Sequence, residues 1–166
     1  MNPAAGTVRA LLLAQARGTP MLRVPEAVAV EGCGFEGCRH FQRMLGKHRE
    51  LLLKRQLLLL DDASREALRV EIGALKENVL LAGLPLDALP PGQRLGLGDE
   101  VVVELTEPCV PCWKVDQIRP GLLSESWGRR GQLARVLRGG RVREGETVRL
   151  LDVNPDAPRI IRPKLP

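Results

Sequence analysis

Glycine and proline interrupt this chain so often that its apolar runs stay short. The sequence has 17 glycines and 13 prolines among 166 residues. Runs of about four to eight apolar residues between such breaks are typical of strands. Many short strands with little regular helix favour an antiparallel barrel or sandwich. We therefore expect a mainly β fold with a few short helices.

The expected elements follow from local patterns. At 101–106, an alternation of apolar and more polar residues predicts a half-buried strand. Asp61 and Asp62 suit the N-terminus of a helix that runs through Leu68 to about Ile72. The other expected strands are 8–14, 27–30, 56–60, 78–82, 133–137 and 147–151, and the similar segments 92–101 and 140–148 are expected to lead from a turn into a strand.

The length fits one domain, which we place at residues 1–154, with a proline-rich tail at 155–166. The leucine-rich runs at 11–13 and 51–60 are too short for a membrane span, and Lys54 and Arg55 interrupt the second. No signal peptide pattern is evident near the start. We therefore expect a cytoplasmic location, where cysteines stay thiols or ligands rather than form disulfides.

The net charge of +5 favours an anionic partner. Nucleic acid is disfavoured because the chain has no tyrosine, two phenylalanines and two tryptophans, and shows no recognition-helix motif. A small anionic ligand suits the basic region around His40, where Arg39 and Arg55 can each donate two parallel hydrogen bonds to a phosphate. A solvated patch without a ligand is the alternative interpretation.

The cysteines Cys109 and Cys112 have the spacing that brings two sulfurs within reach of each other or of one metal. A redox pair would open a helix in a βαβ unit, and the β-rich surroundings disfavour it. A zinc site would need two more ligands, which Cys33 and Cys38 could supply, with His40 as a substitute for one of them.

Cys112 can also act alone. Pro108 and Pro111 would fix its segment, and the neighbouring Lys114 favours the thiolate, which binds soft metals or carries sulfur. The simplest alternative is that both cysteines of the pair are small buried hydrophobic residues.

The order of features along the chain resembles the MOSC domain family. The resemblance covers nearly the whole chain and rests on segments 37–40, 54–67, 76–79, 86–89, 98–99, 106–112, 131–137 and 139–150. It implies a MOSC-like β-barrel that binds molybdenum cofactor (molybdopterin) or takes part in sulfur transfer. One departure is Cys38, which stands where the family commonly has aspartate.

The resemblance also implies roles for single residues. Cys112 corresponds to the family's cysteine, which ligates molybdenum or carries a persulfide, and Asn78 matches the asparagine of its Glu-Asn segment. Positive charge would hold the phosphate of the anionic cofactor, and the residues expected to supply it are Arg39, His40, Arg55, Arg130 and Arg135.

The resemblance further implies the partners. An enzyme of this kind would reduce N-hydroxylated compounds, and a separate redox partner would supply the electrons because the chain has no flavin, haem or iron–sulfur motif. A sulfur carrier would instead receive sulfur from a cysteine desulfurase. The competing function is a zinc-stapled, non-catalytic binding module that uses all four cysteines.

Overall fold

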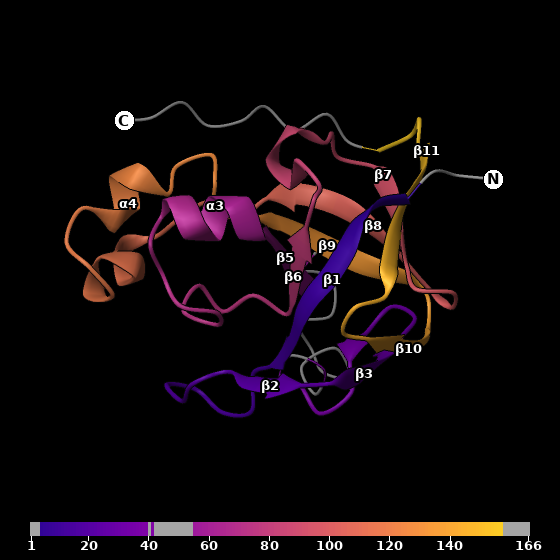
Figure 1. Cartoon of the computed structure of the whole chain (residues 1–166), viewed down its shortest axis with the longest axis horizontal. Coiled ribbons are helices and arrows are strands. Elements are labelled where there is room, and N and C mark those ends of the chain that lie inside the picture. The colour runs from indigo at the N-terminus through magenta and orange to yellow at the C-terminus, as the bar shows by residue number, and fades with distance from the viewer. Residues whose placement is uncertain (1–3, 40, 42–54, 158–166) are drawn as a thin grey trace.

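The computed structural model describes residues 4–39, 41 and 55–157. The elements are mainly strands with short helical connections (Figure 1). The strands are β1 (Ala4–Leu13), β2 (Leu22–Val24), β3 (Glu26–Val30), β4 (Gly34–Phe35), β5 (Leu57–Asp61), β6 (Val79–Ala82), β7 (Gln93–Leu97), β8 (Val101–Pro108), β9 (Gln132–Arg138), β10 (Gly140–Arg143) and β11 (Thr147–Val153). The helical segments are α3 (Asp62–Ala67), η1 (Leu86–Ala88), η2 (Trp113–Gln117) and α4 (Leu122–Glu125).

Seven strands form a closed barrel. Their order is β11, β7, β8, β9, β5, β6 and β1, and β1 pairs again with β11 to complete the ring. The contacts are antiparallel except for the parallel pair β5 and β6. Strand β2 extends from β1, while β10, β3 and β4 form a small separate sheet. The predicted β-barrel is confirmed, and closure leaves none of the seven strands with an unpaired edge.

Strand β5 is buried along its whole length because both of its faces are covered. Leu59 packs inside the barrel with Val103 and Leu105 of β8. Leu60 points the other way and packs with Val115 and Leu122 from the connection after β8. For this reason residues 57–60 are all leucine, and apolar residues do not alternate with polar ones along this strand. Each fully buried leucine stabilises the fold by about 1.5–3 kcal/mol.

Helix α3 begins as the sequence predicts and ends earlier. The side chain of Asp61 accepts a hydrogen bond from the Ala63 N–H at 3.0 Å, which caps the helix. The segments η1, η2 and α4 were not predicted, because they lie where the sequence has no clear helical pattern. No helix in the described part of the chain is long and apolar enough to span a bilayer.

The expectation that α3 continues to about Ile72 is wrong. The helix ends at Ala67, because Arg69 has a φ of 54° and this left-handed conformation stops helical hydrogen bonding. The Leu68 carbonyl, freed at the helix end, accepts a hydrogen bond from Arg119 Nη2 at 2.8 Å. Arg119 therefore supplies the Leu68 carbonyl with the hydrogen bond that the next turn of a longer helix would have provided.

The connection 109–131 joins β8 to β9 and is closed at its base. Pro108 pairs with Gln132 where the two strands meet, and the Cys109 N–H then donates to the Gly131 carbonyl at 2.9 Å. Gly131 has a φ of +92°, and a Cβ there would collide with the Leu59 carbonyl oxygen. Glycine is therefore required at this position, and the two ends of the connection are held against β5.

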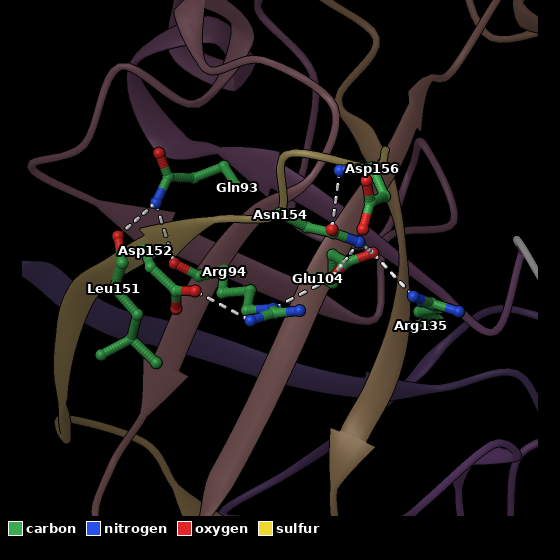
Figure 2. A network of polar contacts seen from close by, with 8 residues as sticks. All are labelled: Gln93, Arg94, Glu104, Arg135, Leu151, Asp152, Asn154 and Asp156. Atoms are coloured by element: carbon green, nitrogen blue, oxygen red, sulfur yellow. Dashed lines mark hydrogen bonds and ion pairs between the residues drawn. The ribbon is translucent and has the colours of Figure 1, made fainter. Parts of the chain in front are cut away.

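A buried carboxylate ties neighbouring strands together (Figure 2). Glu104 of β8 is 3% exposed and accepts hydrogen bonds from Arg94 of β7 at 3.1 Å and Arg135 of β9 at 2.8 Å. Asn154, just after β11, approaches the same carboxylate at 3.3 Å. Asp152 pairs with the outer side of Arg94 at 2.8 Å and is exposed. The buried Glu104 carboxylate thus has a structural role, because a buried charge requires partners such as these.

We predict that Glu104→Gln destabilises the barrel by about 1–3 kcal/mol, because the amide NH₂ would face the arginine donors in a buried position. Chemical denaturation measures the change. The matched control is Asp152→Asn, whose carboxylate is 65% exposed; it should change the free energy of unfolding by less than about 0.5 kcal/mol. Equal effects of the two variants would contradict this account.

Residues 155–157 are described from the tail predicted at 155–166, and the remainder lies outside the described residues. The Ala157 N–H donates to the Asn154 carbonyl at 3.3 Å, so the first residues of this segment turn back toward the end of β11. The domain boundary at 154 stays a prediction.

Candidate functional site

The candidate site lies at the barrel rim, which we define as the end where β5 and β8 finish and β9 begins. α3 follows β5 at this end, and α4 belongs to the connection 109–131 (Figure 1). Cys112 lies in this connection, immediately before η2, with extended backbone angles φ −119° and ψ 170°. Its carbonyl accepts the Val115 N–H at 3.1 Å, which anchors the segment, while its side chain is exposed. Its thiol is therefore accessible.

Cys109 has a different environment from Cys112. It is half-buried, and its backbone is held by Gly131. Burial raises the pKa of the Cys109 thiol, while the positive charges of Arg130 and Arg55 oppose this effect. A buried thiol with a raised pKa is a poor nucleophile and a poor ligand at neutral pH. The two cysteines of the pair are thus separated into an exposed thiol and a protected one.

A pocket of about 190 Å³ lies beside the segment that leads to Cys112. Its walls come from both ends of the connection 109–131 and from η1. The lining residues are Asp87, Pro108, Cys109, Val110, Pro111, Trp127, Gly128, Gly131 and Gln132. Proline, valine and tryptophan side chains make it mainly apolar. The sequence reasoning missed Trp127 and Gln132, because a tryptophan in a loop and a glutamine at a strand start carry no pattern of their own.

The structure places two of the predicted arginines close to Cys109. Both Arg55 and Arg130 act on its thiol through their charge. Arg55 is 61% exposed and pairs with Glu107 at 3.2 Å, so it retains much of its surface for other contacts. Arg130 has a buried Nη1 without a hydrogen-bond partner among the described residues. A buried donor usually has a partner. Arg135 also has such a donor, its Nε, but of the two only Arg130 acts on Cys109 through its charge, which makes Arg130 the stronger anion-binding candidate.

The structure does not place the other predicted cationic residues near Cys109. Arg135 lies four residues beyond Gly131 on β9, about 13 Å along the strand, and pairs with Glu104. Arg39 is half-buried, and its backbone N–H donates to the Ala14 carbonyl at 2.6 Å. His40 lies outside the described residues, as does most of the basic region that follows it. Cofactor roles for these three residues stay predictions.

Asn78 links three parts of the barrel. It is 3% exposed, and its Oδ1 accepts the Leu58 N–H at 3.0 Å. Its Nδ2 donates to the Leu12 carbonyl at 3.2 Å and contacts Cys38 Sγ at 3.6 Å. Cys38 is itself buried in the interior cluster. The side-chain groups of Asn78 are thus committed to protein partners, which gives it a positioning role within the barrel.

Glu77 is a buried carboxylate that the sequence reasoning did not single out. Its Oε1 accepts the Gly73 N–H at 2.6 Å, and its Oε2 has no partner among the described residues. Burial raises the pKa of Glu77, and the charges of Arg130 and Arg65 oppose the shift. Its position directly before Asn78 was the available signal, because a charged residue at the start of a buried strand is unusual. Arg130 therefore acts electrostatically on both Glu77 and Cys109.

The four cysteines are all described, and the structure does not gather them. No three histidine, cysteine, aspartate or glutamate side chains in the described residues lie close enough to share a metal ion. Cys33 lies in the turn before β4 and Cys38 is buried. The zinc-stapled alternative requires Cys33, Cys38, Cys109 and Cys112 in one cluster, so the structure does not support it.

Comparison with known proteins gives a consistent result. A family model described as MOSC domain matches residues 44–149. The fold is similar to that of the YuaD protein from Bacillus subtilis, with a TM-score of 0.71 and 19% identity over 87% of this chain and 94% of that one. It is also similar to YiiM from Geobacillus stearothermophilus, with a TM-score of 0.66 and 17% identity over 89% and 75% of the two chains.

A curated relative from Gibberella moniliformis carries the name "Reductase". It is 33% identical to this chain over 86 residues, which are 49% of this chain and 15% of that protein. The match thus spans a small part of the relative's length. The activity of the whole relative bears on this chain only as a proposal.

We predict that a limiting amount of iodoacetamide labels Cys112 before Cys109. Cys112 is exposed, whereas Cys109 lines a pocket and has a raised pKa. Peptide mass spectrometry after short reaction times measures both sites in one sample, with the buried Cys38 as the slow reference. Faster labelling of Cys109 would show that the two environments are assigned wrongly.

Glu77 predicts a pH dependence of stability. A folded-state pKa raised above the ordinary value of 4.5 gives stability that is present below that pH and lost as the pH rises through the folded pKa. Glu77→Gln keeps an oxygen for Gly73 and removes the charge, so it should be more stable than wild type at neutral pH. The advantage should shrink toward about pH 4.

Urea denaturation at the two pH values measures this difference. Glu66→Gln is the control, because the Glu66 side chain is 69% exposed and should show little effect at either pH. A Glu77→Gln variant that loses stability at neutral pH would instead mean that the ionised carboxylate stabilises the fold.

Proposed function

Because this chain belongs to the MOSC domain family, we propose that it binds molybdenum cofactor at the barrel rim, with the Cys112 thiolate as a ligand of molybdenum. The observation that carries the proposal is the exposed thiol of Cys112 on a segment that is anchored at both ends. Before Cys112, the Cys109 N–H is bonded to the Gly131 carbonyl, and after it the chain enters η2. An accessible thiolate in a fixed segment is the arrangement that a protein ligand to a soft metal requires.

The residues at the rim fit molybdenum cofactor. Thiolate sulfur suits molybdenum, and the cofactor's phosphate is anionic. The unpartnered Nη1 of Arg130 is a donor that an anionic oxygen would satisfy, and Arg55 adds exposed positive charge nearby. When bound, the cofactor supplies redox chemistry that no side chain can supply.

The chain's own residues would bind and orient the group. The hydrogen bond from Cys109 to Gly131 fixes the loop, so the thiol of Cys112 is presented without reorganisation of its backbone. The raised pKa of Cys109 keeps that thiol protonated, so it does not compete for the metal. Asn78 joins β1 and β5 at the start of β6, so its role is structural and lies within the barrel.

The reaction that we propose is reduction of N-hydroxylated compounds, with electrons from a separate redox partner. The named reductase relative, which matches about half of this chain, supports a redox role. The proposal includes a partner because no flavin, haem or iron–sulfur motif is evident in the sequence.

A sulfur-carrier role is the second function that the exposure of Cys112 favours. The Cys112 thiolate would attack the outer sulfur of a cysteine persulfide on a desulfurase. A new S–S bond forms at Cys112, the old S–S bond breaks, and the desulfurase regains its thiolate. Incubation with a cysteine desulfurase and cysteine should then add the mass of one sulfur atom at Cys112, whereas a pure metal ligand gains none.

We predict that the protein contains close to one molybdenum per chain when purified without oxygen from a host that makes the cofactor. Cys112→Ser should lower the metal content about tenfold or more, because the hydroxyl replaces the thiolate ligand. Cys33→Ser is the control and should retain the metal. Elemental analysis gives the result, and an unchanged molybdenum content in Cys112→Ser would exclude the ligand role.

A further inference from the structure

The connection 109–131 carries exposed apolar side chains close to Cys112. Among the described residues, the large apolar side chains that are exposed are Leu22, Val110, Trp113, Ile118 and Val153. Three of these five belong to the short stretch 110–118. Single exposed apolar side chains are ordinary, whereas a group of them marks an interaction site.

Trp113 is the central member of this group. Its side chain is 63% exposed, and it begins η2 directly after Cys112. Val110 precedes it in an extended segment and Ile118 follows it at the end of the 3₁₀ helix, so the Cα of each lies within about 11 Å of the Trp113 Cα. A standard protein interface buries about 800 Å² on each partner, so a single interface can cover all three residues. Tryptophan is also a residue type that contributes strongly to binding at the centre of interfaces.

The position of η2 and α4 leaves this group accessible. α4 lies at the edge of the molecule, beyond α3 (Figure 1), and it is tied to η2 because the Leu123 N–H donates to Asp116 Oδ1 at 2.7 Å. On their inner side, Val115 and Leu122 pack in one cluster with Leu60 of β5. The outer side of the connection is therefore open to another protein in the described part of the chain.

Both acidic residues of the connection are bonded within the protein. Glu125 of α4 accepts hydrogen bonds from Nη1 and Nη2 of Arg119 at 2.9 and 2.8 Å. The Asp116 carboxylate of η2 accepts the Leu123 N–H. The negative charge of the connection is thus largely balanced by groups of the protein itself.

The basic residues nearby are not balanced in the same way. Lys114, Arg129 and Arg69 are exposed, and none of them forms an ion pair with another described residue. The pKa of Glu125 is lowered, chiefly by the hydrogen bonds from Arg119 and further by the charges of Arg69 and Arg129, which places both arginines near α4. Unpaired positive charge around an apolar centre attracts an acidic protein surface. We call the apolar group at 110–118 and these three basic residues the docking surface.

We propose that the docking surface binds the electron-donating partner, and that this partner presents acidic residues around an apolar centre. The proposal rests on the proposed function, because a reductase without an electron carrier of its own needs such a partner. Trp113 follows Cys112 directly, so a donor bound here lies next to the proposed ligand of molybdenum. Electron-transfer complexes use small, short-lived interfaces, which fits the size of this surface.

The binding test uses oxidised flavodoxin, a small acidic flavin protein, as the probe. The indole N–H of Trp113 reports on the docking surface by NMR, because this side chain is exposed at its centre. Flavodoxin should shift the Trp113 signal, and an increase in salt from about 0.05 to 0.5 M should weaken binding about tenfold or more. Cytochrome c, which is basic, should leave the signal unchanged.

Matched variants locate the binding site. Lys114→Glu and Ile118→Ser should each lower the affinity for flavodoxin about fivefold or more. Arg17→Glu is the charge control, because Arg17 is exposed in the turn between β1 and β2, and Val153→Ser is the apolar control, because Val153 is 46% exposed against 45% for Ile118. An unshifted Trp113 signal, or equal effects of variants and controls, would overturn the proposal. Binding to phosphatidylglycerol vesicles but not to flavodoxin would overturn it in favour of a membrane surface.

A kinetic measurement on the molybdenum-loaded protein separates this proposal from the proposed function. Cleavage of one N–O bond consumes two electrons and two protons and gives the amine and water. Flavodoxin hydroquinone supplies one electron as it becomes the semiquinone, and reduced methyl viologen supplies one electron without docking. Ile118→Ser should lower kcat/KM for flavodoxin about fivefold and leave the viologen-driven rate unchanged. Turnover with viologen but not with flavodoxin would overturn the docking surface, whereas failure with both donors would overturn the proposed function.

Discussion

The rim depends on one backbone hydrogen bond, from the Cys109 N–H to the Gly131 carbonyl. It continues the β8–β9 pairing past the end of both strands and closes the connection 109–131 at its base. Gly131 lies so close to Leu59 that no side chain fits, so the closure is held against the fully buried strand β5. The pocket wall, the protection of Cys109 and the exposure of Cys112 all follow from this closure.

The arginines fall into two groups with different roles. Those on the barrel wall, such as Arg94 and Arg135, pair with the buried Glu104 and stabilise the strands (Figure 2). At the rim, Arg130 keeps a buried donor without a partner in the described residues, and its charge acts on both Glu77 and Cys109. The position of the Arg130 guanidinium is therefore a better indication of an anion-binding site than the net charge of +5.

Much of the fold could be predicted from the sequence, because alternation and glycine or proline breaks are local signals. The alternation at 101–106 and the leucine run at 57–60 both mark strands of the barrel. The early end of α3 could not be predicted, since it depends on the left-handed Arg69 and on Arg119 from a distant segment. The same holds for η2 and α4, which are stabilised by packing against the outer face of β5 rather than by a helical pattern of their own.

The site was predictable in part. The family resemblance, now confirmed, pointed to Cys112 and Asn78, but residue types could not show that Cys109 is protected while Cys112 is exposed. The most direct test of the central claim is an anomalous difference map, collected at the molybdenum edge from crystals of cofactor-loaded protein. A peak within bonding distance of Cys112 Sγ is the predicted result. A peak at another residue, or ordered molybdenum away from the rim, would contradict the account.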